Sequence, residues 1–221
     1  MSEREYNSLK QQAEDKHMTM NKFMMKRLEA TRPFFFPVEK VTELANFTNE
    51  RGKRINEIAR AFNAGFGSEA MLVEANALLI EIKERTAIVC REKQALAAEW
   101  RKETGYTKHR KYRAINEKDT HGLMLRLTDA QYTLLQKFLK ITRYTQTLFL
   151  RRLIDRYPID GNNLELVDAY EGYAPYNRIH NNVMQILCKA EKMNIPNEEI
   201  SIMEFLLKYI GKDANRLLEF V

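Results

Sequence analysis

Arg126 is the residue best suited to recognition chemistry. It stands in residues 122–128, a run in which leucine alternates with other residue types. An arginine can donate two parallel hydrogen bonds to guanine in the major groove of DNA, which discriminates against other bases by about 1–3 kcal/mol. Arg126 therefore has the chemistry that reading a base would need. The plainer interpretation is an exposed strand arginine.

A group of cations lies just before this run. Residues 101–113 contain six basic side chains and one acidic side chain, Glu103, and so hold most of the chain's net charge of +6. Such a segment suits contact with phosphate oxygens, although a solvated basic linker over residues 101–121 would have the same composition. The candidate phosphate contacts in it are Lys108, Arg110, Lys111 and Arg113.

No residues are spaced for catalysis or metal binding. The four histidines do not pair with one another or with cysteine at metal-ligand spacing, and the sequence has no glycine-rich phosphate loop. We therefore expect no enzyme activity, no metal and no cofactor. Cys90 and Cys188 fall in apolar helical patterns and are expected to be buried reduced thiols, with a disulfide as the less favoured alternative.

The composition favours a mostly α-helical chain of one or two domains. The chain has 221 residues with only eight glycines and five prolines, and its pI of about 9.2 suits a polyanionic partner. No apolar run approaches the roughly 18 residues that span a bilayer. The charged N-terminus lacks the apolar core of a signal peptide. We expect a cytoplasmic protein without membrane contact.

A strand followed by two helices would position Arg126. The alternation predicts a short β-strand over residues 122–128, with its leucines on one face. Thr128 and Gln131 have the spacing of a capping box that starts a helix. A second helix is predicted to start near Thr145 and to end before Pro158. Its start, at Thr145, Gln146 and Thr147, would offer free N–H groups to a phosphate.

This order of elements resembles the ribbon-helix-helix family over residues 122–156. The resemblance implies an antiparallel ribbon, made by strands of two units, that enters the major groove of DNA. The outward residues facing the bases would be Gly122, Met124 and Arg126, and Thr128 would lie near a phosphate. The sequence departs from the usual pattern because glycine and methionine offer no side-chain hydrogen bond to a base.

The start of the chain repeats this unit without its strand. A shift of 126 residues places Ser2 on Thr128, Thr19 on Thr145 and Phe23 on Phe149. In the first repeat, Thr19 and Asn21 would then contact phosphate. A chance match of two amphipathic helices is the alternative. The missing first strand would lie upstream in the natural chain or be lost, so that the single strand pairs with a second copy, with another segment or with nothing.

A helix is predicted over residues 38–48. Residues 52–63 have apolar residues at helical spacing, which predicts a further helix with one apolar face. This second segment resembles the helix that follows the ribbon-helix-helix unit in plasmid mobilisation accessory proteins of the MobC type. The residues that carry the resemblance include Gly52, Asn56, Arg60 and Asn63. A weaker copy follows at residues 180–187, where a shift of 125 places Asn181 on Asn56. An ordinary helix with a polar stripe is the alternative.

The sequence thus predicts a single-chain tandem of ribbon-helix-helix-like repeats with long additional helices. The first repeat would cover residues 1–100 and the second residues 122–221. The resemblance implies a bacterial relaxosome accessory protein that binds double-stranded DNA near a plasmid transfer origin and assists a separate relaxase. Two alternatives remain open: a transcriptional repressor with the same DNA chemistry, and a helical protein-interaction module that does not bind DNA.

Overall fold

The structure, a computed structural model, describes residues 1–106, 121–155, 159–161, 164–193, 195 and 197–218, with side chains left undescribed over 164–173. The predicted mostly α-helical class is confirmed. The helices are α1 (Glu3–Glu14), α2 (Met20–Ala30), α3 (Val38–Asn63), α4 (Glu69–Thr104), α5 (Asp129–Thr142), α6 (Gln146–Ile154), α7 (Leu164–Ala190), a single 3₁₀ turn (Glu191–Met193) and α8 (Asn197–Leu218).

The chain forms two compact units, and each unit draws on both halves of the sequence. The helix-pair unit comprises Met1–Phe36 and Ala97–Asn163, and the bundle unit comprises Pro37–Leu96 and Leu164–Val221. Neither predicted repeat, 1–100 or 122–221, is therefore a compact unit by itself. The physical reason is that the apolar faces of corresponding helices in the two halves contribute to shared cores.

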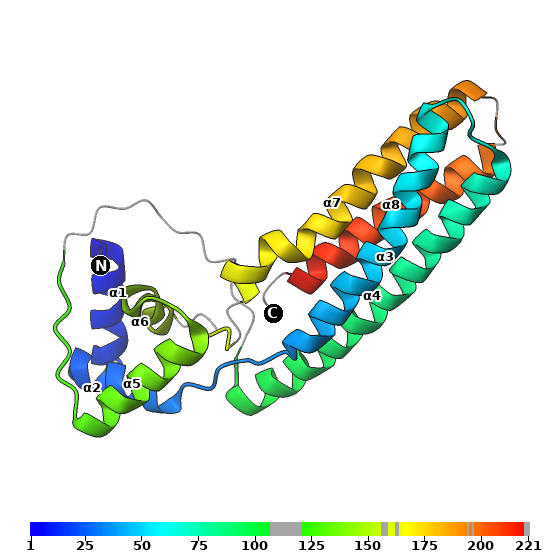
Figure 1. The fold of residues 1–221 in the computed structure, drawn as a ribbon. Coiled ribbons are helices and arrows are strands. Elements are labelled where there is room, and N and C mark those ends of the chain that lie inside the picture. The colour runs from blue at the N-terminus through cyan, green and yellow to red at the C-terminus, as the bar shows by residue number, and fades with distance from the viewer. Residues whose placement is uncertain (107–120, 156–158, 162–163, 194, 196, 219–221) are drawn as a thin grey trace. The chain divides into compact units, whose positions relative to one another are not determined.

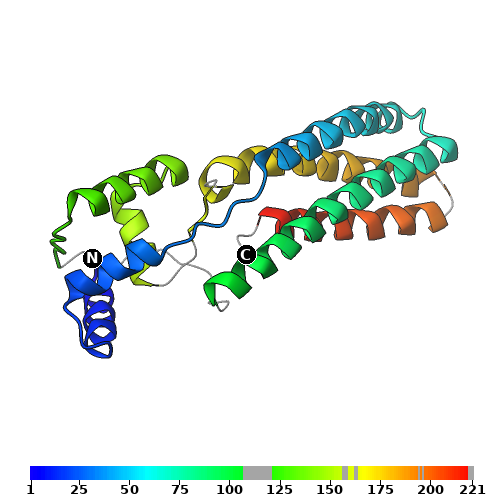
Figure 2. The ribbon, with the colours of Figure 1, turned by 90° about the horizontal axis from the view of Figure 1, so that it is seen from below.

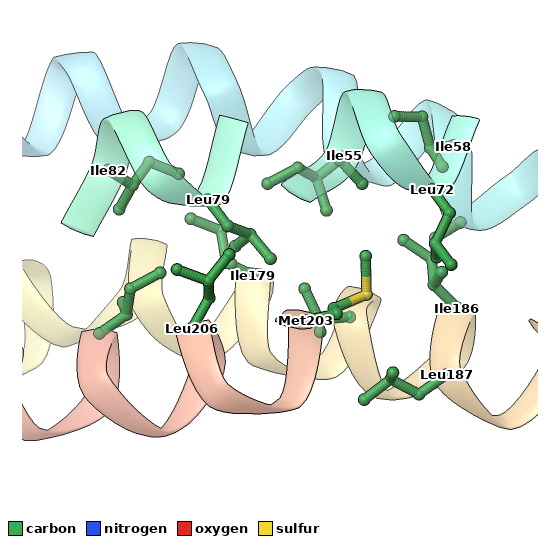
Figure 3. Packing of buried hydrophobic residues seen from close by; sticks show 14 of the residues in the cluster. Ile55, Ile58, Leu72, Leu79, Ile82, Ile179, Ile186, Leu187, Met203 and Leu206 are labelled. Carbon is green, nitrogen blue, oxygen red and sulfur yellow. The ribbon is translucent and has the colours of Figure 1, made fainter. Parts of the chain in front are cut away.

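Four long helices, α3, α4, α7 and α8, lie side by side in the bundle unit (Figure 1, Figure 2). Buried residues recur at intervals of three and four, as in Leu72, Ala75, Leu79 and Ile82 of α4. This spacing forms one continuous apolar stripe on a helix. Figure 3 shows Leu79, Ile179 and Leu206 turned toward one another within the core. The repeated stripe explains why the helices pack along much of their length.

The two predicted segments 38–48 and 52–63 form one helix, α3, which continues through Gly52. A Cβ atom added at Gly52 would lie 3.4 Å from Ile179 of α7. This glycine therefore marks a close approach of two helices and not a helix end. A central glycine costs a helix about 1 kcal/mol relative to alanine, a cost that the packing of α3 on α7 offsets.

Two short helix pairs, α1 with α2 and α5 with α6, form the helix-pair unit around a second core. The capping box predicted at Thr128 is present, and Ser2, which the 126-residue shift aligns with Thr128, forms another. The Ser2 hydroxyl accepts a bond from the Glu5 N–H at 3.3 Å, and the Thr128 hydroxyl accepts one from the Gln131 N–H at 3.3 Å. In return, Glu5 and Gln131 accept the N–H groups of the two cap residues. Such reciprocal caps fix where α1 and α5 begin.

The turns within the two helix pairs also correspond. The turn after α1 has His17 at φ 53°, and the turn after α5 has Arg143 at φ 55°. Residues other than glycine rarely adopt this left-handed conformation, because Cβ then crowds the backbone. His17 and Arg143 are 126 residues apart, as are the next helix caps, Thr19 and Thr145. Each pair thus makes its turn at the position that the predicted shift assigns.

The predicted β-strand over residues 122–128 is wrong, since these residues are extended but form no strand in the described structure. A strand needs a ladder of backbone hydrogen bonds to a neighbour. Over the described residues 121–127, the backbone of His121 pairs with Met1 and the backbone of Arg126 bonds to the Asn21 side chain, while Thr128 already bonds within α5. The segment keeps the extended conformation without a second strand.

Both cysteines are free thiols, but only one matches the expectation of burial. Cys90 on α4 is buried, and burial raises its pKa to about 11. Cys188 on α7 is exposed, so the prediction that it is buried is wrong. Among the described helices, none is both long and apolar enough to cross a bilayer.

Candidate nucleic-acid interface

The extended segment before α5 presents two faces of opposite character. Leu123, Leu125 and Leu127 are half-buried and pack against the core of the helix-pair unit. Between them, Gly122, Met124 and Arg126 are exposed, with 83 % of the Met124 surface accessible. Side chains of an extended chain alternate between its two faces. The three predicted base-contact residues therefore share one outward face, although no ladder supports it.

Asn21 at the start of α2 holds the segment at Arg126. Its side-chain Nδ2 donates to the Arg126 carbonyl at 3.2 Å, and its Oδ1 accepts the Arg126 N–H at 2.8 Å. The carboxamide thus satisfies both backbone groups of one residue, as a neighbouring strand would. The Asn21 side chain, predicted to contact phosphate, has this partner instead. Sequence reasoning missed the contact because nothing local to Asn21 points to a residue 105 positions away.

Met1 and His121 form a two-bond pair at the other end of the segment. The Met1 amino group donates to the His121 carbonyl at 2.8 Å, and the His121 N–H donates to the Met1 carbonyl at 3.1 Å. The Tyr6 ring also stacks on the His121 ring, with centroids 4.5 Å apart. Reciprocal bonds of this kind are those of an antiparallel strand pair.

Part of the backbone of the extended segment has no hydrogen-bond partner. Within the described structure, the N–H and C=O groups of Leu123, Leu125 and Leu127 form no hydrogen bond. In an extended chain, the backbone groups of alternate residues point to the same edge. These groups therefore lie on the edge where His121 meets Met1.

Two helix starts have backbone N–H groups available for an anion. The Thr19 hydroxyl accepts the Lys22 N–H at 3.3 Å, and the Thr145 hydroxyl accepts the Leu148 N–H at 3.3 Å. Each cap leaves the N–H groups of the first two helical residues without a partner in the described structure. A helix start also has positive potential, so the starts of α2 and α6 suit phosphate. The predicted contacts Gln146 and Thr147 are these first two residues of α6.

The predicted basic linker is only partly described. Helix α4 continues to Thr104, so the first residues of the predicted linker 101–121 are helical. Trp100 on this helix donates from Nε1 to the Arg32 carbonyl at 2.8 Å. The four predicted phosphate contacts of the linker, Lys108, Arg110, Lys111 and Arg113, lie outside the described residues.

The mobilisation-type residues lie on α3 in the bundle unit, and so in a different unit from residues 122–126. Asn63 donates from Nδ2 to the Gln185 side-chain oxygen of α7 at 2.7 Å. Arg60 is exposed, and Asn56 is half-buried beside a groove between α3 and α7. The structure therefore brings Asn56 and Asn63 against α7, while Arg60 remains at the surface.

The described residues contain no cluster of histidine, cysteine and carboxylate side chains that could hold a metal ion. Comparison of the chain with protein-family models, with curated proteins and with solved structures found no match.

Proposed function

We propose that the protein binds double-stranded DNA through the exposed face of residues 122–126 and acts as a relaxosome accessory protein near a plasmid transfer origin. The observation that carries the DNA part is the two-faced extended segment. Its leucine side is packed on the helix-pair core, its other side is exposed, and Asn21 holds it at Arg126. The major groove admits a two-stranded ribbon, and a packed, extended element with one free face would supply one strand of it.

Arg126 supplies the base-reading chemistry. Its side chain is exposed and forms no ion pair with any described residue. The guanidinium is therefore available to donate to the O6 and N7 atoms of guanine. Gly122 lets the backbone approach the base edges, and Met124 makes apolar contact only. The expected recognition is narrow and depends mainly on one guanine contact.

We propose that a second copy of the chain completes the ribbon in the DNA-bound form. An antiparallel ladder needs N–H and C=O groups along one edge of each strand. On the edge where His121 meets Met1, the backbone groups of Leu123 and Leu125 have no hydrogen-bond partner in the described structure. The same groups of the second copy would pair with them.

Phosphate contacts would come from the starts of α2 and α6, at Thr19 and at Thr145, Gln146 and Thr147, and from the basic linker. The mobilisation part of the proposal rests on the resemblance of residues 52–63 to the MobC type. Under this resemblance the protein partner would be a relaxase. A protein of this kind increases the transfer of a plasmid that carries its origin, whereas a repressor would alter transcription without changing transfer.

A salt titration tests the DNA part. The full chain is titrated into a labelled duplex of mixed sequence at about 50 and about 200 mM salt, where the log–log slope is about −0.9 for each phosphate contacted. We expect a steep loss of affinity with salt. Absence of binding at the lower salt would contradict the proposal.

Selection of bound duplexes from a random pool then tests Arg126. We expect Arg126→Ala to remove the preference for one guanine, whereas Arg60→Ala, an exposed arginine of the bundle unit, should leave the selected sequence unchanged. An equal loss of affinity on all sequences would make Arg126 a phosphate contact. Light scattering on the DNA complex should show two chains, and a strict monomer would contradict the shared ribbon.

A protein-interaction module without DNA binding is the second candidate. The observation that favours it is Met124, an apolar side chain with 83 % of its surface exposed at the centre of the outward face. Exposed apolar side chains often mark protein contacts. Under this function, Met124→Ala would weaken binding to a protein partner, and the salt titration on DNA would show no binding.

A further inference from the structure

A polar groove of about 780 Å³ lies in the bundle unit between α3 and α7. Its walls carry five asparagines: Asn46, Asn49 and Asn56 on α3, and Asn181 and Asn182 on α7. The close approach of the two helices at Gly52, which also lines the groove, forms part of its wall. The groove is distinct from the extended segment 122–126, which belongs to the other unit.

The asparagine side chains of the groove retain most of their hydrogen-bonding capacity. Within the described part of the chain, the amides of Asn46, Asn56, Asn181 and Asn182 bond to no other residue. Asn49 accepts one long bond, from Arg178 at 3.4 Å. Each carboxamide has two donor hydrogens and an acceptor oxygen. The groove therefore presents several donors and acceptors together.

Two cations in the groove are available for an acidic group. Lys53 and Arg178 are exposed and form no ion pair with any residue that the structure describes. The neighbouring arginines of α3 are already paired, Arg51 with Glu81 at 3.0 Å and Arg54 with Glu74 at 2.6 Å. Glu50 also lines the groove, and its carboxylate is paired with Arg51 at 3.1 Å. The available positive charge is thus confined to two points and does not form a broad basic surface.

The two helices present the same pair of groups. On α3, Lys53 is followed by Asn56, and on α7, Arg178 is followed by Asn181, so that a cation precedes an amide by three residues on each helix. Residues three apart lie on one face of a helix. Because α3 and α7 are neighbours along the groove (Figure 1), a ligand would meet two cation–amide pairs.

We propose that this groove binds an extended acidic peptide segment of a protein partner. The asparagine amides would bond to the N–H and C=O groups of the peptide main chain, and Lys53 and Arg178 would pair with its carboxylates. A nucleic-acid backbone fits less well, because phosphates only accept hydrogen bonds. They would leave the asparagine oxygens without donors. The proposal does not depend on DNA binding by the other unit.

A peptide selection tests the groove directly. The full chain is used to select from a phage-displayed library of random short peptides, and the selected peptides are synthesised with a fluorescent label. We expect the selected peptides to be rich in aspartate and glutamate. Their affinity should fall about tenfold or more for Lys53→Glu/Arg178→Glu and for Asn56→Ala/Asn181→Ala, as loss of one or two charged or amide bonds predicts.

Matched variants and a charge exchange complete the test. Arg60→Glu and Asn63→Ala lie on α3 outside the groove lining and should leave peptide affinity unchanged. Peptides whose acidic residues are replaced by lysine should bind Lys53→Glu/Arg178→Glu better than the wild type, which also shows that this variant is folded. Selected peptides that bind all variants equally would overturn the proposal. A short single-stranded oligonucleotide that competes through Lys53 and Arg178, with no peptide binding, would also overturn it.

Discussion

The helix-pair unit and the bundle unit bury apolar surface with helices of very different length. In the helix-pair unit, α1, α2, α5 and α6 have 12, 11, 14 and 9 residues. In the bundle unit, α3, α4, α7 and α8 have 26, 36, 27 and 22 residues. Isolated helices shorter than about 12–15 residues are marginal in water. The short helices therefore depend far more on their caps and on polar ties between segments.

The polar ties of the two units differ accordingly. In the helix-pair unit, Arg27 donates to the Ile154 carbonyl at 2.8 Å and to the Gln12 side chain at 2.7 Å, which joins α2, α6 and α1. In the bundle unit, polar ties also join helices, as from Asn76 of α4 to the Glu199 carboxylate of α8 at 2.7 Å, and they add to a continuous apolar core. The comparison indicates that the ties of the first unit gather at helix ends, whereas those of the second accompany long packed helix faces.

The largest effects should come from core truncations, one in each unit. Phe149 of the helix-pair unit and Phe62 of the bundle unit are both fully buried. Phe149→Ala and Phe62→Ala should each cost about 3–5 kcal/mol. Hydrogen exchange read by mass spectrometry should show lost protection mainly in the unit that carries the substitution. Loss spread evenly over both units would show that they unfold as one.

Removal of the Arg27 side chain should have the next largest effect. Arg27→Ala leaves carbonyls at the end of α6 without their charged donor and should destabilise the helix-pair unit by about 1.5–3 kcal/mol. Urea unfolding followed by exchange protection in α6 measures the loss. Lys26→Ala, at the exposed neighbouring position, is the control and should be nearly neutral. Similar losses for both variants would refute the role of Arg27.

Removal of a helix cap should destabilise the helix-pair unit more than the bundle unit. Thr145→Ala and Thr19→Ala should each cost about 1 kcal/mol. Ser68 accepts the Met71 N–H at 3.4 Å at the start of the much longer α4. Ser68→Ala should cost less, because α4 can lose its first turn and keep its core stripe. Thermal unfolding of the three variants tests this order, and an equal or larger loss for Ser68→Ala would remove the distinction.

The smallest effect concerns the pH dependence of stability, and its sign should differ between the units. Burial, followed by repulsion from Glu5, raises the pKa of the Asp155 carboxyl. Asp155→Asn should therefore stabilise the helix-pair unit at neutral pH, by less than about 1 kcal/mol. The gain should shrink as pH falls through the raised pKa and vanish below the ordinary pKa of aspartate.

Glu74 of the bundle unit provides the opposite case. Its hydrogen bond from Arg54 lowers the pKa of the Glu74 carboxyl. Glu74→Gln should slightly destabilise the bundle unit above the ordinary glutamate pKa, and the difference should disappear as pH falls through the lowered value. Urea unfolding of both variants between pH 3 and pH 7 measures these effects. This range covers the ordinary pKa values of aspartate and glutamate, about 3.9 and 4.3. A common sign for the two variants would contradict the assigned causes.

Local sequence predicted the helix starts well. Thr128 and Thr145 are predictable as helix starts because cap residues act within three positions of themselves, and the repeat extends this prediction to Ser2. The outward face of residues 122–126 also followed from their alternation. The β-strand at the same residues was wrong, because a ladder depends on a partner that local sequence does not specify.

Contacts between distant segments could not be predicted from the sequence. The bond from Asn21 to Arg126 and the approach of α7 to Gly52 depend on how helices pack, and the local patterns do not encode either one. The same holds for the asparagine groove. The relation of Asn181 to Asn56 was visible as a weak repeat, but the two residues line one groove only because α3 packs against α7. Cys188 was misassigned as buried for a similar reason, since an apolar pattern on α7 does not tell which neighbours cover it.

Photo-cross-linking at residue 124 tests the central claim most directly. A photoreactive phenylalanine analogue replaces Met124, and a control variant carries it at Phe66, a similarly exposed position of the bundle unit with 78 % accessible surface. Irradiation with duplex DNA at low salt should cross-link the protein through residue 124 and not through residue 66. Cross-links at residue 66 alone, or at neither position while the protein remains folded, would contradict DNA binding through the extended segment.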